Sequence, residues 1–292
     1  MNNIKYNKIK WCLGCGNYSI INQLSKVLSL LKIKKKYIVI VSGIGCSSRL
    51  PYYIKFKGVH TIHGRAFSIA TGIKLSNKKF NVWLITGDGD SFSIGLKHLL
   101  HTIRRNININ ILIFNNGIYA LTKGQKSYSN YNNNSFNIIA LMLSSGATFV
   151  AKTLYNNPIH LRKTLYYANK HIGTSCVEII QNCPIYNNIK NKINNIIYLK
   201  NNYKLIYNNK CILLKNNKPI IKNNNKKFKN IWIHNIYNLY KSFLLSNFYI
   251  INKKLPIPIG IIYKKRKYKT KHLVCKKKKY NIENIFNKNI IF

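Results

Sequence analysis

Two hydrophobic runs in this chain end in the same way, and this limits the folds that the chain can adopt. Residues 82–85 (VWLI) lead directly into 86–90 (TGDGD), and residues 109–114 lead into 115–119 (NNGIY). Both runs are largely apolar without strict alternation, which is typical of strands buried on both faces of a parallel sheet. Because parallel strands place their carboxyl ends at one edge, the polar residues that follow are expected to meet there.

The same alternation of short apolar runs and helix-length stretches continues over most of the chain. Strands are expected at 37–42, 82–86, 109–115, 148–152 and 176–181, and helices at 19–31, 65–75, 93–104, 138–144 and 158–170. Strands separated by helices predict an α/β fold with a parallel sheet flanked by helices. We expect an N-terminal segment (1–10), one domain (11–190) and a poorly defined Lys/Asn/Ile-rich C-terminal extension (191–292), with a short ordered return near 255–260.

Acidic residues are almost absent from this chain. Asp88, Asp90, Glu178 and Glu283 stand against 49 Lys and Arg residues, for a net charge of +45. The basic residues are scattered and no nucleic-acid-binding motif accompanies them, so we expect no nucleic-acid partner. The excess of Lys, Asn, Ile, Tyr and Phe matches A/T-rich codons and is explained by mutational drift. A positive surface would still steer an acidic protein partner.

The location of the protein is predicted from its apolar segments and cysteines. No stretch of ~20 uninterrupted apolar residues is present, and the N-terminus has no apolar core of a signal sequence, so we expect neither membrane insertion nor export. The seven cysteines are an odd number. A reducing cytoplasm is therefore expected, where metal or cluster ligation outranks disulfides.

The first polar constellation pairs Asp88 with Asn116. Mg²⁺ takes oxygen ligands in octahedral geometry and usually shares them with substrate phosphates. The Asp88 carboxylate, the Asn116 amide oxygen and the Ile118 backbone carbonyl would supply three ligands, and a diphosphate and a water the others. Gly87 and Gly89 would allow close approach of a phosphate, followed by helical amides from about residue 93. The alternative is a plain strand-to-helix turn capped by Asp90.

A second constellation is formed by cysteines in turns. Cys12 and Cys15 stand in WCLGCG, Cys46 follows a predicted strand in SGIGCSS, and Cys183 follows another in QNCP. Four thiolates suit either a structural zinc or an iron–sulfur cluster, and one CxxC pair does not decide between them. Unligated cysteines are the third possibility. The other three cysteines lack such a setting and are interpreted as incidental.

Two further polar residues follow Cys46. Arg49 could bind a substrate carboxylate, since a guanidinium pairs with carboxylates in bidentate fashion. His63 stands in the segment HTIHGR (60–65) and could contact a cofactor or move a proton. A solvated Arg and a loop His with satisfied hydrogen bonds are the simpler interpretations.

Taken in order, these motifs resemble one known family. The chain is similar to the beta subunits of the 2-oxoacid:ferredoxin oxidoreductases, most closely the 2-oxoglutarate type. The resemblance covers roughly residues 11–186, and beyond 190 only 255–260 is similar. Its motifs are 11–16, 43–53, 60–72, 86–90, 114–125, 146–151 and 178–183.

The resemblance implies a thiamine diphosphate-binding domain, with Mg²⁺ held by Asp88, Asn116 and the Ile118 carbonyl. It implies a 4Fe–4S cluster on Cys12, Cys15, Cys46 and Cys183. It places Arg49 at the distal carboxylate of an acidic 2-oxo acid, and we assign His63 a catalytic role. The residues expected to line the cofactor are Ile44, Gly45, Cys46, Ser47, Gly89, Asp90, Ala120 and Leu121.

The implied reaction is oxidative decarboxylation of 2-oxoglutarate with coenzyme A to succinyl-CoA, CO₂ and reduced ferredoxin. The same chemistry on pyruvate or a branched-chain 2-oxo acid is the alternative. Activation of thiamine diphosphate requires a positioned carboxylate. Asp88 and Asp90 are committed to the diphosphate, Glu178 lies in an apolar strand and Glu283 in the basic tail. The missing glutamate is therefore expected from an alpha subunit, in a heterodimer or a dimer of heterodimers.

The chain departs from the family pattern at two places. Leu13 replaces a usual proline, and the loop after Gln125 reads KSYSNY in place of a Ser-Pro-Thr pattern.

Two other functions are alternatives to the one that the resemblance implies. A nucleic-acid-binding or structural protein with relic motifs would shift DNA in a salt-sensitive way without binding thiamine diphosphate. A cluster-free thiamine-dependent decarboxylase or carboligase would turn over 2-oxo acids without a cluster.

Overall fold

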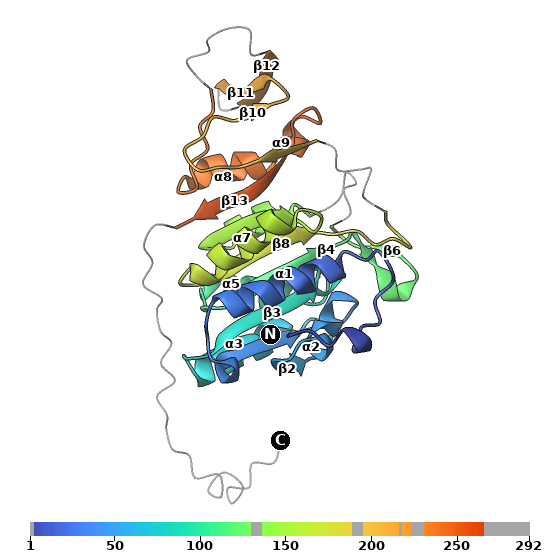
Figure 1. Ribbon diagram of the computed structural model, residues 1–292. Helices are drawn as coiled ribbons and strands as arrows, with labels where there is room; N and C mark the ends of the chain where they lie inside the picture. The colour runs from blue at the N-terminus through green and yellow to red at the C-terminus, as the bar shows by residue number, and fades with distance from the viewer. Residues whose placement is uncertain (1–2, 130–135, 189–194, 216–217, 224–230, 266–292) are drawn as a thin grey trace, which may run out of the picture.

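The computed structural model describes residues 3–129, 136–188, 195–215, 218–223 and 231–265, and its centre is an eight-stranded sheet (Figure 1). In order across the sheet, the strands are β2 (Lys57–His60), β1 (Ile38–Ser42), β3 (Asn81–Gly87), β4 (Asn110–Asn115), β8 (Ser175–Ile180), β7 (Phe149–Leu154), β13 (Ile257–Lys264) and β9 (Ile196–Tyr198). Neighbouring strands are parallel except β7 and β13, which run antiparallel. The α/β fold with a mostly parallel sheet is confirmed.

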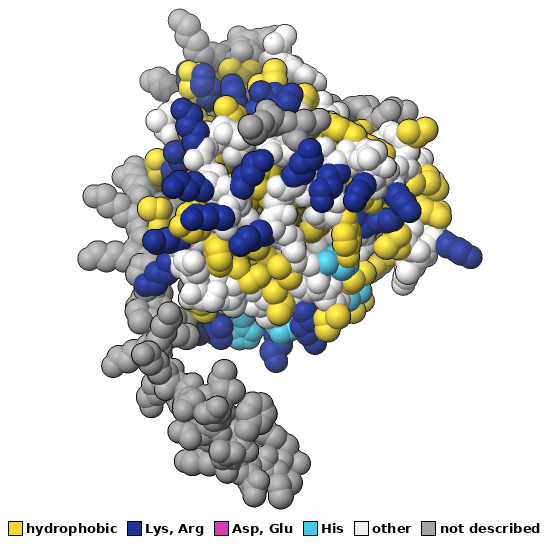
Figure 2. All heavy atoms as spheres, turned by 60° about the horizontal axis from the view of Figure 1, so that its bottom comes forward, with side chains coloured by type: hydrophobic (Ala, Val, Ile, Leu, Met, Phe, Trp, Pro, Cys, Tyr) yellow, Lys and Arg dark blue, Asp and Glu magenta, His cyan; other side chains and the backbone are white. Residues whose placement is uncertain are grey.

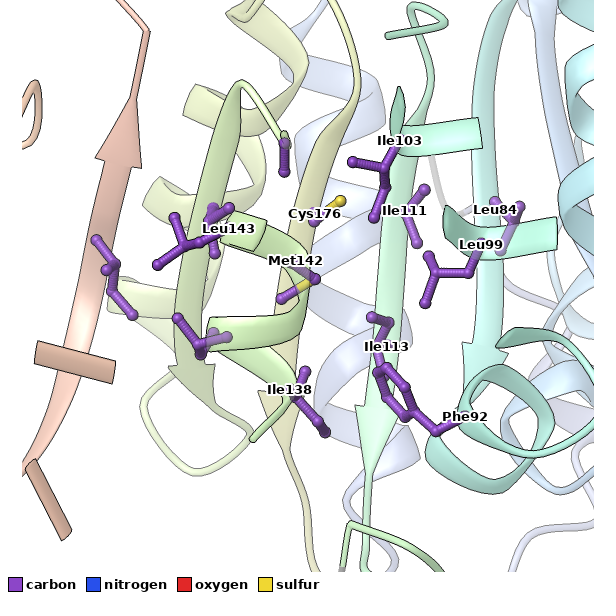
Figure 3. Packing of buried hydrophobic residues seen from close by; sticks show 14 of the residues in the cluster. Leu84, Phe92, Leu99, Ile103, Ile111, Ile113, Ile138, Met142, Leu143 and Cys176 are labelled. Atoms are coloured by element: carbon purple, nitrogen blue, oxygen red, sulfur yellow. The ribbon is translucent and has the colours of Figure 1, made fainter. Parts of the chain in front are cut away.

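Helices cover both faces of the sheet because successive strand residues point to opposite sides. In β4, Leu112 and Phe114 pack with α1 (Asn17–Leu30) and α7 (Pro158–Lys170). Ile111 and Ile113 pack on the other face, whose core also contains Leu99, Ile103 and Met142 (Figure 3). The helices on that face are α3 (Ala66–Ser76), α5 (Leu96–Arg104), α6 (Ile138–Ser144) and α8 (Leu239–Ser246).

Shorter elements connect these layers or extend from them. They are the helices α2 (Leu50–Tyr53), α4 (Asp88–Phe92) and α9 (Phe248–Ile251), and the 3-10 helices η1 (Tyr6–Lys8), η2 (Lys35–Tyr37), η3 (Ser47–Arg49) and η4 (Ala120–Thr122). A two-stranded hairpin joins β5 (Ile118–Tyr119) to β6 (Gln125–Lys126), and a separate sheet contains β10 (Ile206–Tyr207), β11 (Lys210–Lys215) and β12 (Lys218–Asn223). None of the helices in the described ranges has the length and hydropathy needed to cross a membrane.

All five expected strands are present, with ends that differ by one or two residues. The helix expected from residue 93 is wrong at its start: α4 begins at Asp88, directly after β3, and the chain bends at residues 93–95 before α5. The bend is fixed by close packing, because a Cβ on Gly64 would lie 2.8 Å from the backbone nitrogen of Gly95. The Gly95 N–H also donates to the Asp90 carbonyl at 3.0 Å.

The region beyond 190 contains more structure than its composition predicts. The sheet continues into it through β13, where the expected ordered return at 255–260 leads into a strand that pairs with β7 on one side and β9 on the other. Gly260 in this strand has φ +142 and packs against Leu199, a conformation that favours glycine. The predicted boundary near 190 falls in 189–194, and Glu283 and Cys275 lie in 266–292, so these three lie outside the described residues.

Candidate functional site

A cavity of about 150 Å³ opens at the carboxyl ends of β1, β3 and β4. The polar residues after neighbouring strands meet there, as expected for a parallel sheet. Every residue predicted to line a cofactor or to hold Mg²⁺ borders this cavity, and so does His63. The lining consists of Ile44, Gly45, Cys46, Ser47, His63, Gly87, Asp88, Gly89, Asp90, Phe114, Asn116, Ile118, Tyr119, Ala120, Leu121, Thr122 and Gln181.

Asp88 is buried at the first position of α4, with 2% of its surface exposed. Its Oδ2 accepts hydrogen bonds from the hydroxyls of Ser127 and Ser129, which return to it from the loop after β6. Burial raises the pKa of the Asp88 carboxyl, and these hydroxyls offset part of that effect. A carboxylate held out of water in this way gains from a bound cation.

Asn116 and Ile118 are presented by the turn that follows β4. The turn is tight because Gly117 has φ +72, and the Ile118 N–H donates to the Asn116 Oδ1 at 3.2 Å. The Asn187 side chain donates to the Asn116 carbonyl at 2.8 Å and fixes the turn from outside. An amide oxygen has two lone pairs, so Asn116 Oδ1 keeps one acceptor position for a metal. Carboxylate, amide and carbonyl oxygens thus border one cavity, and this donor set fits Mg²⁺.

Asp90 has a different setting from Asp88, although both border the cavity. Its carboxylate accepts from the Gly64 N–H at 2.8 Å and from the Thr86 hydroxyl at 2.8 Å. It also pairs with a ring nitrogen of His63, whose side chain is 34% exposed. A Cβ on Gly43 would overlap the carboxylate, so this position requires glycine. Asp90 therefore joins the loops after β1 and β2 to α4, and it does not act as a helix cap.

The four predicted cluster cysteines come from three segments that approach one another. The Trp11 Nε1–H donates to the Cys46 carbonyl at 2.7 Å, and the Gly16 N–H donates to the Asn182 carbonyl at 3.2 Å. The pKa of the Cys15 thiol is raised to about 11, chiefly by burial and to a smaller extent by the neighbouring Cys46, Cys183 and Cys12 thiols. In the described ranges, no three His, Cys, Asp or Glu side chains are placed to hold a metal ion.

Arg49 is not among the described residues that border the cavity, although Cys46, three residues earlier, is. It is half-buried at the end of η3, and its charge lowers the pKa of the Cys46 thiol, which burial and the neighbouring thiols raise. Arg49 therefore lies near Cys46, which borders the cavity.

Several residues at the site were missed from sequence. Ser127 and Ser129 belong to the loop that departs from the family pattern, yet both supply hydroxyls to Asp88. Tyr119 packs so closely on Gly89 that a Cβ there would lie 2.3 Å from its ring. Gln181 borders the cavity from the end of β8. Their proximity to strand ends was the one indication in the sequence. The spacing of residues along the chain does not show how closely a loop approaches Asp88.

Comparisons with known proteins agree with this geometry. The family model described as "Thiamine pyrophosphate enzyme, C-terminal TPP binding domain" matches residues 43–179. The 2-oxoglutarate oxidoreductase subunit KorB of Mycobacterium tuberculosis is 46% identical over 192 residues, covering 62% of this chain and 52% of that protein. The chain thus spans about half the length of this relative. The 2-oxoacid:ferredoxin oxidoreductase subunit beta of Saccharolobus solfataricus is 42% identical, covering 67% of this chain and 68% of that protein.

A solved structure is similar over almost the whole chain. It is the 2-oxoglutarate:ferredoxin oxidoreductase from Magnetococcus marinus, with 2-oxoglutarate, coenzyme A and succinyl-CoA bound. The TM-score is 0.77 at 26% identity, and the match covers 98% of this chain and 94% of that chain. The described segments beyond residue 190 therefore belong to the shared architecture.

Proposed function

Because the chain belongs to the 2-oxoacid:ferredoxin oxidoreductase beta subunits, we propose that it binds the cofactors of a 2-oxoglutarate:ferredoxin oxidoreductase. The reaction is oxidative decarboxylation of 2-oxoglutarate with coenzyme A, giving succinyl-CoA, CO₂ and reduced ferredoxin. The solved relative with 2-oxoglutarate and succinyl-CoA bound supports this substrate. Pyruvate or a branched-chain 2-oxo acid is the alternative.

The observation that carries the proposal is the convergence of Asp88, Asn116 and Ile118 on one cavity with small residues around it. These three would hold Mg²⁺, and the backbone at Gly87 and Gly89 would lie against the diphosphate. Thiamine diphosphate, when bound, supplies a nucleophilic thiazolium carbon and an electron sink for decarboxylation. The residues expected against the cofactor are Ile44, Gly45, Cys46, Ser47, Gly89, Asp90, Ala120 and Leu121.

Two residues at the rim are assigned to the substrate and to proton movement. The Arg49 guanidinium would bind the distal carboxylate of 2-oxoglutarate and orient the 2-oxo group toward the cavity. His63 is oriented by its contact with Asp90 and keeps part of its ring exposed. It would therefore exchange a proton at the cavity mouth.

The site is incomplete without a partner chain. The three acids in the described ranges, Asp88, Asp90 and Glu178, are all buried and hydrogen-bonded to this chain. None is free to act on the aminopyrimidine of the cofactor, so an alpha subunit would supply that glutamate. The partnership is a heterodimer or a dimer of heterodimers.

Electrons would leave through a 4Fe–4S cluster on Cys12, Cys15, Cys46 and Cys183. Their mutual effect on the Cys15 pKa and the convergence of three segments support this ligand set. Cys12 is exposed, so the cluster would lie near the surface. Lys and Arg side chains are spread over the face in Figure 2, where no Asp or Glu side chain is visible, and such a face favours docking of an acidic carrier such as ferredoxin. Free cysteines and this cluster suit a reducing cytoplasm.

The proposal is tested by anaerobic co-expression of the chain with its alpha subunit. We expect coenzyme A-dependent reduction of an electron acceptor, fastest with 2-oxoglutarate among a series of 2-oxo acids. Reduction fastest with pyruvate would move the substrate assignment to the alternative. Turnover without cluster absorbance would indicate a cluster-free decarboxylase, and binding of DNA without thiamine diphosphate would contradict the proposal altogether.

A further inference from the structure

Glu178 is a buried acid that the proposed chemistry does not use. It lies in the middle of β8 with 1% of its surface exposed. Its Oε1 accepts from the Asn115 Nδ2–H at 2.8 Å, and its Oε2 lies 3.2 Å from the Lys152 Nζ. Lys152 is its direct cross-strand neighbour on β7, and the Lys152 side chain is 12% exposed.

The bond from Asn115 to Glu178 determines which way the Asn115 amide points. Because the NH₂ group donates to the carboxylate, the amide oxygen faces the turn after β4. There it accepts from the Gly117 N–H at 3.1 Å and from the Ser129 hydroxyl at 3.0 Å. Without an acceptor at position 178, the amide could rotate, and both contacts would be lost.

The two contacts of Asn115 lead to the predicted Mg²⁺ ligands. Gly117 lies between Asn116 and Ile118, and Ser129 hydrogen bonds the Asp88 carboxylate. A continuous series of polar contacts therefore runs from Lys152 through Glu178, Asn115 and Ser129 to Asp88. The series also separates two cavities. Asp88 and Asn116 border the cofactor cavity, and a second cavity of about 330 Å³ is bordered by Asn115, Ser129, Lys152 and Glu178.

We propose that Glu178 and Lys152 are positioning residues for the metal–diphosphate site, acting through the orientation of the Asn115 amide. This inference rests on the proposed function. A buried ion pair contributes little net stability compared with apolar residues of similar volume, so stability alone does not explain it. Outer contacts that orient metal ligands have a large effect on metal affinity, and this pair is placed to do so for Asp88, Asn116 and Ile118.

The test measures Mg²⁺ binding to the assembled enzyme after removal of divalent cations, at saturating thiamine diphosphate. We expect Glu178→Met, which leaves the Asn115 amide without an acceptor at this position, to weaken Mg²⁺ binding ~10- to 100-fold. The matched control is Thr153→Val, next to Lys152 on β7. Thr153 is buried and its hydroxyl bonds the His160 Nδ1 at 2.8 Å, away from Asn115. The control should lower the melting temperature and leave the Mg²⁺ dissociation constant unchanged.

A double variant separates positioning from folding, since Glu178→Met also leaves Lys152 without its carboxylate. Lys152→Met with Glu178→Met removes both charges, so stability should recover while Mg²⁺ binding stays weak, because Asn115 still lacks its acceptor. Recovery of Mg²⁺ affinity together with stability would overturn the inference, as would equal effects of Glu178→Met and Thr153→Val on Mg²⁺ binding. If the unaltered enzyme bound neither thiamine diphosphate nor Mg²⁺, the proposed function itself would fail instead.

Discussion

The Asp90 carboxylate accepts a hydrogen bond from the Gly64 N–H at 2.8 Å, linking two loops at the cavity. Gly64 has φ +73, and a Cβ there would lie 2.7–2.8 Å from atoms of Ile94 and Gly95. The same carboxylate pairs with His63. The position of His63 over the cavity therefore depends on a glycine that allows two loops to approach closely.

Substitution of Gly64 is expected to destabilise the protein. Gly64→Ala should lower the free energy of unfolding by ~1–3 kcal/mol, because the side chain is strained by its φ and collides with backbone. Gly72→Ala is the matched control, since Gly72 lies in α3 with open space around its Cβ. It should raise the free energy of unfolding by ~0.5–1 kcal/mol through helix propensity. Denaturant unfolding of both variants measures the contrast, and equal effects would contradict it.

The Asp88 carboxylate is expected to lower the stability of the metal-free protein while favouring metal binding. Burial raises its folded-state pKa above the unfolded value of 3.8, so the folded state holds the proton more tightly. The carboxyl therefore lowers the free energy of unfolding of the metal-free protein progressively as the pH rises above 3.8 and through the raised pKa. Asp88→Asn should remove this loss and stabilise the metal-free protein at neutral pH.

The same variant should weaken Mg²⁺-dependent thiamine diphosphate binding by more than ~100-fold, since it removes a charged ligand rather than an outer contact. Cluster absorbance should remain, because none of the four cysteines is altered. Titration calorimetry and urea unfolding at several pH values provide the two measurements. A variant that bound the cofactor with normal affinity would remove Asp88 from the metal site.

The cysteines allow a test of the cluster that is independent of the cofactor. Cys183→Ser should bleach or destabilise the cluster and stop electron transfer to ferredoxin, while thiamine diphosphate still binds. Cys176→Ala is the control, because Cys176 is buried in the hydrophobic core beside Ile111 and Met142 (Figure 3) and is not one of the proposed cluster ligands. Absorbance and iron content report the result. Loss of the cluster in both variants would point to general instability instead.

The sequence predicted the site residues that directly follow strands, but it did not predict those that reach the site from loops. The positions of Asp88 and Asn116 followed from two strand endings, because parallel strands end at one edge. Ser127 and Ser129 could not be placed, since their contact with Asp88 depends on the path of a loop. The proposed role of Glu178 could not be predicted either, because it depends on contacts with Lys152 and Asn115 from neighbouring strands. β13 was hidden because its pairing with β7 joins segments about a hundred positions apart.

His171 should make the stability of the protein sensitive to acid. Burial, followed by the charge of Lys264, lowers its pKa from 6.5 to about 4, and its Nε2 pairs with the Thr148 hydroxyl at 2.7 Å. The unfolded chain therefore binds the proton more readily. The free energy of unfolding should fall by up to ~1.4 kcal/mol per pH unit as the pH drops from 6.5 to about 4. His171→Gln should flatten this dependence in urea unfolding, and an unchanged slope would contradict it.

The proposed role of Arg49 predicts a preference for a dicarboxylic substrate that depends on this side chain. Its guanidinium lies half-buried beside the cavity, three residues after Cys46. Loss of a charge-assisted pair with the distal carboxylate should raise the apparent KM for 2-oxoglutarate ~10- to 100-fold in Arg49→Ala. Pyruvate has no such carboxylate, so its KM should barely change. Arg104→Ala, at the end of α5, controls for loss of one positive charge. Steady-state kinetics with both substrates test the assignment, because an equal rise for both would show that Arg49 does not read the second carboxylate.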